Sequence, residues 1–493
     1  MSEERSTVVS TSSSLAANWR EIVSLRLVWP LVLICLGVSL HALDALVVAT
    51  MMPAMVAEIG GVNLVSMTIS LYELGSVIAS AACGLITLRY GIKTPMFVCT
   101  VLFAAGCLLS AVAPHMWVVL IGRLLQGLGG GGLLALSFVA TAMLFPRHLL
   151  ARAMGAVSVF WGASAFVGPL LGGVFVEYST WRNGFVMFAI LASLLSLGIL
   201  AKIRDAAPSN PGVGPTRFPI WRLVYLTAGV LCIAYAGAHI SLISSPAFLV
   251  IGIVCFRLFL GFDAKENENR LLPRQALSFR NPVGAAFIMV LCFSAASVAL
   301  SIYGALIITA LHSVSSLTAG YIIATPALGW AAASALVSGF PEHHDRKLIG
   351  VGMMLAAVAL CGFAYSVPYG SLWLIAGTGL LEGTGFGIAF TFISRRICAL
   401  VSANEIERAT SSIATAQAIG YAVGASCIGM VANATGFAAF IDVVTMRFIA
   451  TAIFLASSPI ILIGLLATYR FVATEPTSDP CGQNGPGTRA KCE

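Results

Sequence analysis

Charged residues are scarce in this chain of 493 residues: Asp, Glu, Lys and Arg make up 10% of it, whereas 59% is hydrophobic. The mean hydropathy is +0.95. Apolar stretches of about 18 or more residues recur along the chain, as is typical of transmembrane helices. This balance excludes a soluble globular domain, and we expect a multi-pass membrane protein.

The sequence also lacks the motifs of most enzyme classes. It has no Walker loop, nucleotide-binding fingerprint or nucleophile elbow, so ATP-driven transport and hydrolysis have no support. None of its 12 cysteines has a partner at Cys-x-x-Cys spacing, and in apolar stretches a thiol behaves as a small inert hydrophobe. We therefore expect no enzyme, cofactor, metal site or disulfide framework. The Ser-rich start does not resemble a cleaved signal peptide.

Fourteen apolar stretches are long enough to cross a bilayer. Six precede a linker rich in Pro, Gly and Asn, two follow it, and six more come after a charged loop. We therefore predict an all-α membrane protein with about fourteen transmembrane helices, near residues 29–52, 65–88, 95–113, 117–142, 153–176, 183–202, 221–240, 246–263, 284–309, 315–337, 349–367, 371–394, 410–432 and 446–469.

Positive charges are distributed unevenly between the two sides of these helices. The loops on the N-terminal side hold most of the Lys and Arg residues, whereas the opposite loops hold only Arg182 and Arg447. This asymmetry predicts an inner-membrane protein with both termini in the cytoplasm. It also accounts for the net charge of +7, so no nucleic-acid partner is needed.

The predicted organisation follows from these stretches. We expect a cytoplasmic tail (1–28), a six-helix bundle (29–204), a linker (205–219), two inserted helices (220–263), a cytoplasmic loop (264–283), a second six-helix bundle (284–469) and a disordered tail (470–493).

Two glycine-rich motifs lie on neighbouring predicted helices. Arg123, Gln126, Gly127 and Gly129 form Arg-x-x-Gln-Gly-x-Gly, and residues 168–173 read Gly-Pro-x-x-Gly-Gly, with Gly168, Pro169, Gly172 and Gly173. Glycine lets two helix backbones approach closely in lipid. Together the motifs resemble the fourth- and fifth-helix motifs of the major facilitator superfamily, and the second is typical of its antiporter branches.

An internal repeat supports the resemblance. Leu-Leu-Gln-Gly-x-Gly at 124–129 is echoed by Leu-Leu-Glu-Gly-x-Gly at 380–385, an offset of 256 residues from Gln126 to Glu382. At this offset Gly168 and Gly173 match Gly424 and Gly429. The two six-helix bundles are therefore predicted to be related halves with two helices inserted between them. This arrangement resembles the fourteen-helix, drug:proton antiporter branch of the superfamily.

Asp44 lies in a first-helix segment that resembles the signature of that branch. Leu-Asp-Ala-Leu-Val-Val-Ala-Thr-Met-Met-Pro at 43–53 keeps the spacing from Asp to Pro, but Leu46 and Ala49 replace the expected Thr and Asn. The two replacements remove polar contacts, so the substrate preference of the branch does not transfer directly.

Three charged side chains are predicted to lie at one depth in the first bundle. From the helix rise, Asp44 and Glu73 are roughly 13 Å from the outer ends of their helices and Arg123 is roughly 10 Å from its own. Because a charge at mid-bilayer costs roughly 2.5–3.5 kcal/mol, we expect these groups to face a cavity and pair. The functional interpretation is a protonation site that holds or releases Arg123. The alternative is a permanent pair that only fixes helix packing.

Four further residues are candidates for the same region. His41, one turn before Asp44, is a candidate proton relay, and a neutral, hydrogen-bonded histidine is the structural alternative that we favour. We assign Tyr72, Glu73, Gln126 and Glu382 to substrate binding, Glu382 because it occupies the Gln126 position of the second half. A protonated Glu382 that hydrogen-bonds a neighbouring helix is the structural alternative.

The loop after the second helix resembles the superfamily motif Gly-x-x-x-Asp-Arg-x-Gly-x-Arg/Lys. Gly84, Arg89, Gly91 and Lys93 match it, but Leu88 replaces the aspartate. In the family that acid helps latch the halves together, so its absence implies a weaker or different latch. Asp345 and Arg346 in the corresponding loop of the second half are a candidate compensation. The matching residues, with Gly127 and residues 168–173, are predicted structural or gating positions.

The resemblance implies a proton-coupled exporter of an amphipathic drug or metabolite, acting as a monomer in the bilayer on protons and a small molecule. Two alternatives remain at this stage. One is an uptake symporter of a small organic solute, and the other is a non-transporting receptor or scaffold on a transporter fold.

Overall fold

The structure is a computed structural model. It describes residues 27–146, 149–203, 219–238, 244–266, 272, 277–400, 406–437 and 442–474. Most of the predicted tails and the 205–219 linker, and part of the 264–283 loop, lie outside these residues. Within the described ranges all regular structure is helical, which confirms the predicted fold class.

Fourteen spans are long and apolar enough to cross a membrane, as predicted. In chain order the helices are α2 (Val28–Ile59), η1 (Val62–Leu64), α3 (Val65–Tyr90), α4 (Lys93–Ala111), α5 (Met116–Leu144), α6 (Leu150–Tyr178), α7 (Trp181–Lys202), α8 (Ile220–Ala238), α9 (Ser244–Lys265), α10 (Pro282–His312), α11 (Ser316–Val337), η3 (Glu342–His344), α12 (Asp345–Tyr369), α13 (Leu372–Leu400), α14 (Ile406–Ala434), α15 (Val443–Leu455) and α16 (Ser458–Ala473).

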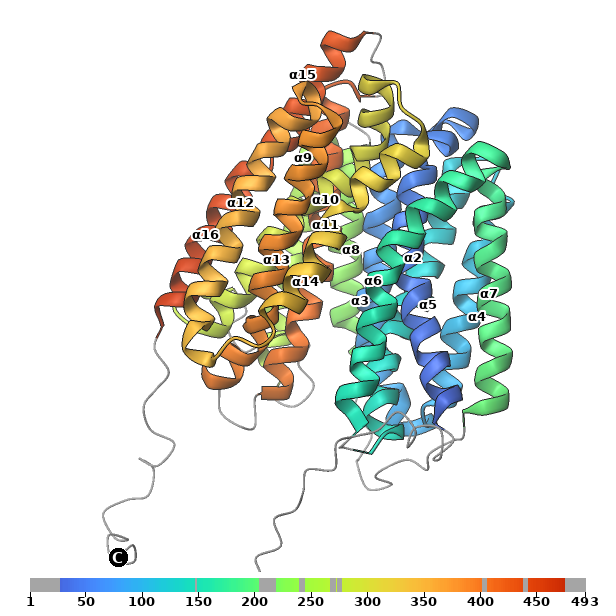
Figure 1. Cartoon of the computed structure of the whole chain (residues 1–493), viewed down its shortest axis with the longest axis vertical. Coiled ribbons are helices and arrows are strands. Elements are labelled where there is room, and N and C mark those ends of the chain that lie inside the picture. The colour runs from blue at the N-terminus through green and yellow to red at the C-terminus, as the bar shows by residue number, and fades with distance from the viewer. Residues whose placement is uncertain are drawn as a thin grey trace, which may run out of the picture.

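The helices form two bundles that stand side by side (Figure 1). The N-terminal half comprises α2 to α7 and the C-terminal half α10 to α16. The halves meet where α6 packs against α11 and α3 packs against α14, while the inserted α8 packs against both α14 and α3. We call the end of the molecule where α2 begins and α16 ends the Val28 end, and the other the far end.

Several helix boundaries differ from the sequence prediction, and two of the differences involve a proline. The first helix was expected to end at residue 52, but α2 continues past Pro53 to Ile59, because a membrane helix tolerates an internal proline where neighbouring groups compensate. The last span was expected to be one helix over 446–469. It is broken between Leu455 and Ser458, where Pro459 occupies the first turn of α16, a position that suits proline.

The close approaches of the glycines confirm that the two halves are related. A Cβ on Gly127 of α5 would collide with the backbone carbonyl of Tyr72 on α3, and a Cβ on Gly383 of α13 would collide with that of Pro326 on α11. The two glycines occupy matching positions of the repeat, and α3 and α11 are the second helices of the two halves. Each half is therefore packed by the same helix contact.

The second pair of matching glycines lies between the halves. A Cβ on Gly173 of α6 would come 2.6 Å from the Cβ of Leu317 on α11, and one on Gly429 of α14 would overlap the side chain of Ser66 on α3. Each glycine thus allows the fifth helix of its half to approach the second helix of the other half. The interface between the halves has the same pseudo-symmetry as the repeat.

Candidate functional site

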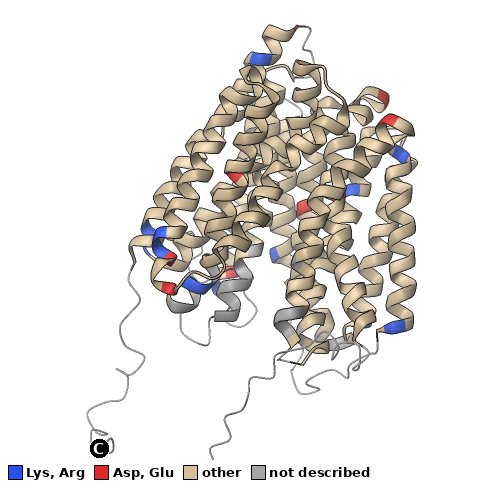
Figure 2. Cartoon of the chain, in the orientation of Figure 1, with Lys and Arg blue, Asp and Glu red and all other residues tan. Residues whose placement is uncertain are grey.

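A buried ion pair joins α2 and α5 near the middle of the N-terminal half. Arg123 Nη1 donates to Asp44 Oδ2, and the two residues are 1% and 0% exposed. With α2 extended to Ile59, Asp44 lies roughly 23 Å from either end of its helix, deeper than the sequence estimate. Figure 2 shows that most charges lie at the helix ends and only a few at mid-height. The predicted pairing of Asp44 with Arg123 is therefore present.

Three more groups surround the guanidinium of Arg123. Its Nη1 also donates to Gln126 Oε1 at 2.7 Å, and its Nε donates to the backbone carbonyl of Thr68 at 3.4 Å. The ring of Tyr72 lies 4.2 Å from its Cζ, a cation–π contact. Arg123 thus has neutral partners in addition to Asp44. Asp44 Oδ1, by contrast, is buried without a hydrogen-bond partner among the described residues.

His41 is connected to this cluster through Tyr72 and not through Asp44. The Tyr72 hydroxyl lies 2.8 Å from His41 Nδ1, and the two rings stack with centroids 5.5 Å apart. The ring of Trp161 on α6 is 6.0 Å from His41. Tyr72, which is 2% exposed, therefore lies between the histidine and the guanidinium. Its predicted role in substrate binding stays a prediction.

Glu73 is the exception among the three charges predicted to share one depth. It is half-buried on α3 and forms no ion pair or hydrogen bond with Arg123 or any other residue that the structure describes. The expectation that both carboxylates pair with the arginine therefore holds for Asp44 alone. Helix rise gives the depth of a side chain but not the direction in which it leaves the helix, and Tyr72 occupies the face toward Arg123.

Glu382 on α13 is 3% exposed, and its Oε2 has no hydrogen-bond partner among the described residues. Tyr421 on α14 is close enough to interact electrostatically with both Glu382 and Glu73. Its hydroxyl accepts a hydrogen bond from Gln417 Nε2 at 3.2 Å. One carboxylate from each half therefore lies within electrostatic range of Tyr421.

The sequence prediction missed Tyr421 and Gln417. The available signal was their spacing of four residues within α14, which places two large polar side chains on one face of a helix.

The predicted latch motif is only partly described. The side chains of Leu88 and Arg89 lie outside the described set, and Gly84 lies within α3. Gly91 ends α3 with a φ of +71°, a conformation that favours glycine. Lys93 is the first residue of α4. These positions are consistent with a tight turn between the two helices.

The contacts described for Asp345 and Arg346, the proposed compensation, lie within the second half. Asp345 pairs with Arg395 of α13, whose Nε lies 2.9 Å from Asp345 Oδ2. Arg346 Nε donates to the carbonyl of Val472 at 2.9 Å. Both contacts hold the Val28 ends of C-terminal helices together. Neither reaches the N-terminal half.

The Gly-Pro-x-x-Gly-Gly segment of α6 packs against α2 just beyond the level of Asp44, on the side toward the far end. A Cβ on Gly168 would lie 2.8 Å from the Cβ of Leu46, and one on Gly172 would lie 2.8 Å from that of Thr50, both on α2. Pro169 lies within α6 and faces Gly320 of α11. Together with Gly173, the segment allows α2, α6 and α11 to approach closely.

Hydrogen bonds between the halves also lie toward the far end. Ser70 Oγ of α3 is 3.1 Å from Ser426 Oγ of α14 and donates to the carbonyl of Ala422 at 3.2 Å. Asn433 of α14 donates through Nδ2 to the carbonyl of Asn63 at 2.9 Å.

Asn433 also connects the inserted helices to both halves. Its Nδ2 donates to the carbonyl of Gly237 at the end of α8 at 2.7 Å, and Asn63 Nδ2 donates to the carbonyl of Ala238 at 3.3 Å. The far end of α8 is therefore hydrogen-bonded to both halves. We call this group of four residues the Asn433 junction.

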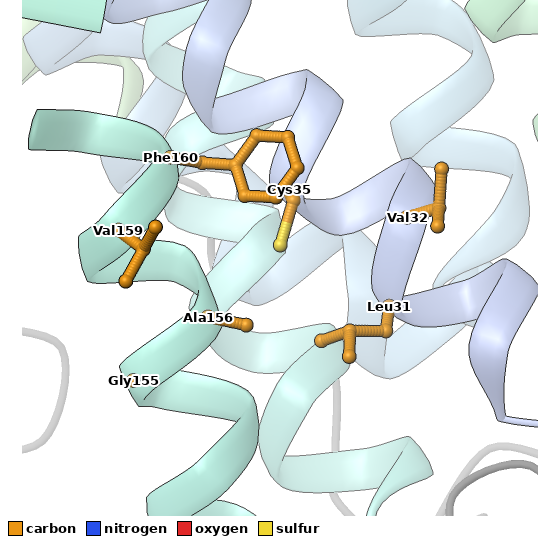
Figure 3. A pocket seen from close by; sticks show the side chains of 7 residues that line it. All are labelled: Leu31, Val32, Cys35, Gly155, Ala156, Val159 and Phe160. Atoms are coloured by element: carbon orange, nitrogen blue, oxygen red, sulfur yellow. The ribbon is translucent and has the colours of Figure 1, made fainter. Parts of the chain in front are cut away.

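A pocket of about 550 Å³ lies between α2 and α6 toward the Val28 end (Figure 3). Its lining is entirely apolar apart from one thiol: Leu31, Val32, Cys35, Gly155, Ala156, Val159 and Phe160. Cys35 precedes Asp44 by roughly 13 Å along the helix. The pocket is thus separate from the buried charges. Within the described ranges, no group of three or more His, Cys, Asp and Glu residues is placed to hold a metal ion.

Comparisons with known proteins agree with this architecture. The Major Facilitator Superfamily profile matches residues 34–341. A probable multidrug-efflux transporter of Mycobacterium tuberculosis is 28% identical over 438 residues, covering 86% of this chain and 91% of the relative. The multidrug efflux pump SdrM of Staphylococcus aureus is 23% identical over 398 residues, covering 79% and 86%. The solved nucleoside transporter NupG superposes with a TM-score of 0.62 at 12% identity, covering 90% of this chain and 99% of that one.

Proposed function

Because this chain belongs to the Major Facilitator Superfamily and is a transporter rather than an enzyme, we propose that it is a proton-coupled exporter. Its cargo is an amphipathic drug or metabolite, carried across the inner membrane by alternating access. The observation that carries the proposal is the buried Asp44–Arg123 pair, with Asp44 midway along α2. Relatives named as multidrug-efflux transporters support the direction of transport.

Protonation of Asp44 is the proposed coupling step. A proton on the carboxylate removes the charge that holds Arg123, and the guanidinium keeps Gln126 and the carbonyl of Thr68 as acceptors. The buried arginine therefore keeps two hydrogen-bond acceptors when Asp44 is neutral, although its charge then has no counter-ion. Tyr72 adjoins this guanidinium and His41 contacts Tyr72, so His41 is the proposed proton relay, acting through Tyr72.

Glu73 and Glu382 are the proposed residues for the cargo or a second proton. They come from different halves and share Tyr421 as a neighbour. A cargo or proton that binds between them interacts with both halves at once. Its binding free energy therefore depends on how the halves are arranged, as coupling to a conformational change requires.

The hydrogen bonds at the far end support alternating access. Those between Ser70 and Ser426 and those of Asn433 join the halves there, so the described state is held closed at that end. We place the Val28 end in the cytoplasm, because its loops carry most of the positive charges. Export then requires these hydrogen bonds to break while the Val28 ends of the halves approach each other. We propose that one chain is sufficient.

The test is proton-coupled transport in everted membrane vesicles, read as dissipation of an acid-inside pH gradient when an amphipathic dye is added. Asp44→Asn should lower this dissipation about 5- to 150-fold, the range of typical coupling free energies between two ligands. Glu58→Gln is the matched control, since Glu58 pairs with Arg182 in an exposed position at the far end. Its transport should be unchanged.

The double variant Asp44→Asn/Arg123→Gln separates coupling from structure. It removes both charges, so it avoids an unpaired buried arginine. If the pair only fixes helix packing, this neutral variant should transport like the wild type, which would contradict the proposed coupling role. Acidification of the vesicle lumen on adding dye, in place of dissipation, would indicate symport.

A further inference from the structure

Two positive charges lie on the face of α9 that is turned away from the rest of the protein. The helix packs mainly against α8, through Gly252, whose Cβ would lie 3.0 Å from the carbonyl oxygen of Gly229. At 100° per residue, Arg257, Gly261 and Lys265 lie about 140°, 180° and 220° around the axis from Gly252. All three are exposed. They therefore form a stripe opposite the α8 contact.

This stripe faces lipid. Only 17% of the most apolar window of α9 is buried within the protein, compared with 89% for α10. The exposed fractions of Val250, Val254 and Leu258, on the same side of α9, are 59%, 49% and 41%. Arg257 lies roughly 12 Å from Lys265 along the helix, within the span. A charge on a lipid-facing surface is costly unless it reaches a partner or the membrane interface.

Among the residues that the structure describes, no acidic side chain forms an ion pair with Arg257 or Lys265. The nearby Asp263 lies on the α8 side, where its Oδ1 accepts from Arg222 at 2.7 Å and its Oδ2 accepts from the backbone N–H of Leu272 at 2.9 Å. The Asp263 carboxylate is therefore already bonded on the side of α9 that faces α8. The two cations of the stripe lack a described counter-ion.

Gly261 leaves open space between the two cations. A Cβ added there would meet no atom within 4 Å, and no side chain of α9 projects from this position. We propose that Arg257, Gly261 and Lys265 bind the phosphate of an anionic phospholipid in the leaflet at the Val28 end. Arginine and lysine both suit phosphate oxygens. Basic surfaces at this depth recognise anionic headgroups, and Val250, Val254 and Leu258 contact the acyl chains.

The test is native mass spectrometry of the delipidated full-length protein, titrated with phosphatidylglycerol or phosphatidylcholine. The wild type should retain one tightly bound phosphatidylglycerol and no equally tight phosphatidylcholine. Each surface cation contributes about 5-fold to the affinity for an anionic lipid. Arg257→Gln or Lys265→Gln should therefore lower the affinity for phosphatidylglycerol about 5-fold, and the double variant should lower it about 30-fold. Lys202→Gln/Arg280→Gln, which removes one lysine and one arginine from the Val28 end, is the matched control and should bind like the wild type.

A second variant keeps both charges. Gly261→Leu fills the space between the cations in a position where the protein has room, so it should fold normally and still bind phosphatidylglycerol several-fold more weakly. If the Lys202/Arg280 control loses as much affinity for phosphatidylglycerol, binding depends on the general surface charge and the proposal is overturned. Full displacement by millimolar inorganic phosphate would indicate a site for free phosphate. A wild-type dimer that Arg257→Gln/Lys265→Gln converts to monomers would identify a second copy as the occupant.

Discussion

The two halves of this transporter share their helix packing but differ in their buried charge. In the N-terminal half, α5 approaches α3 at Gly127, and in the C-terminal half α13 approaches α11 at Gly383. At the same offset of 256 residues, however, Leu300 and Gly379 stand where the first half has Asp44 and Arg123. The bundle architecture therefore does not require the ion pair. A costly feature that the scaffold can do without is a good candidate for function.

The charge that the C-terminal half does contain is of a different kind. Glu382 takes the place of Gln126, but the half provides no arginine at the matching position, and Glu382 Oε2 has no described partner. One half thus holds a compensated pair and the other a single carboxyl group. A carboxyl group buried without a counter-ion is stable only in its neutral form. We therefore expect Glu382 to carry a proton in this state.

The largest expected effect is the loss of stability when one charge of the pair is removed. Arg123→Gln leaves Asp44 buried without a cation and should lower the free energy of unfolding by about 3–5 kcal/mol. Glu382→Gln replaces a neutral group by a similar one and should change it by less than about 1 kcal/mol, the scale of one hydrogen bond in a membrane protein. Reversible unfolding in mixed micelles measures both. Equal losses of unfolding free energy in Arg123→Gln and Glu382→Gln would show that the two halves stabilise their buried charges in the same way.

The next effect concerns the shared packing. Gly127→Ala and Gly383→Ala should each destabilise the protein by about 1–3 kcal/mol, because the new methyl group collides with a backbone carbonyl of the neighbouring helix. Gly377→Ala in α13 is the control: its Cβ would meet no atom within 4 Å, so helix propensity should make it neutral or slightly stabilising. A large difference between Gly127→Ala and Gly383→Ala would contradict the equivalence of the two contacts.

The smallest effect is expected between the halves. Ser426→Ala removes the hydrogen bond to Ser70 Oγ and should weaken the closed far end by about 0.6 kcal/mol, the average for such bonds in membranes. Cysteines introduced on the two halves at the far end should then be labelled about threefold faster by a membrane-impermeant thiol reagent, since 1.4 kcal/mol is tenfold. Thr378→Ala, whose hydroxyl bonds only within its own helix, should leave the labelling rate unchanged.

The number and type of helices could be predicted from the sequence, because long apolar stretches have few alternatives in a membrane. The pairing of Asp44 with Arg123 was also accessible, since helix rise places both near one depth. The other partners of each side chain could not be predicted from the sequence. Gln126 and Tyr72 complete the environment of Arg123, while Glu73 lies on another face. Such directions depend on how each helix is rotated against its neighbours.

Other features could not be predicted because hydropathy does not register them. The stretch containing the break between α15 and α16 is apolar on both sides, although Ser457 and Pro459 supplied a local signal. The grouping of Tyr421 with Glu73 and Glu382 joins three helices that are far apart in sequence. The predicted domain boundaries and the functional roles of the individual site residues stay predictions.

The Asn433 junction has a consequence for how a fourteen-helix member of this superfamily moves. The Nδ2 amide of Asn433 donates hydrogen bonds to the carbonyls of both Asn63 and Gly237. The inserted α8 is therefore bonded to both halves where they meet, and not to one half alone. If the halves rotate against each other as proposed, the Asn433 junction is the pivot of that rotation, or its hydrogen bonds must break in every transport cycle. Without α8 the halves would lack this connection, so α8 would affect how far, and about which axis, the two halves can separate.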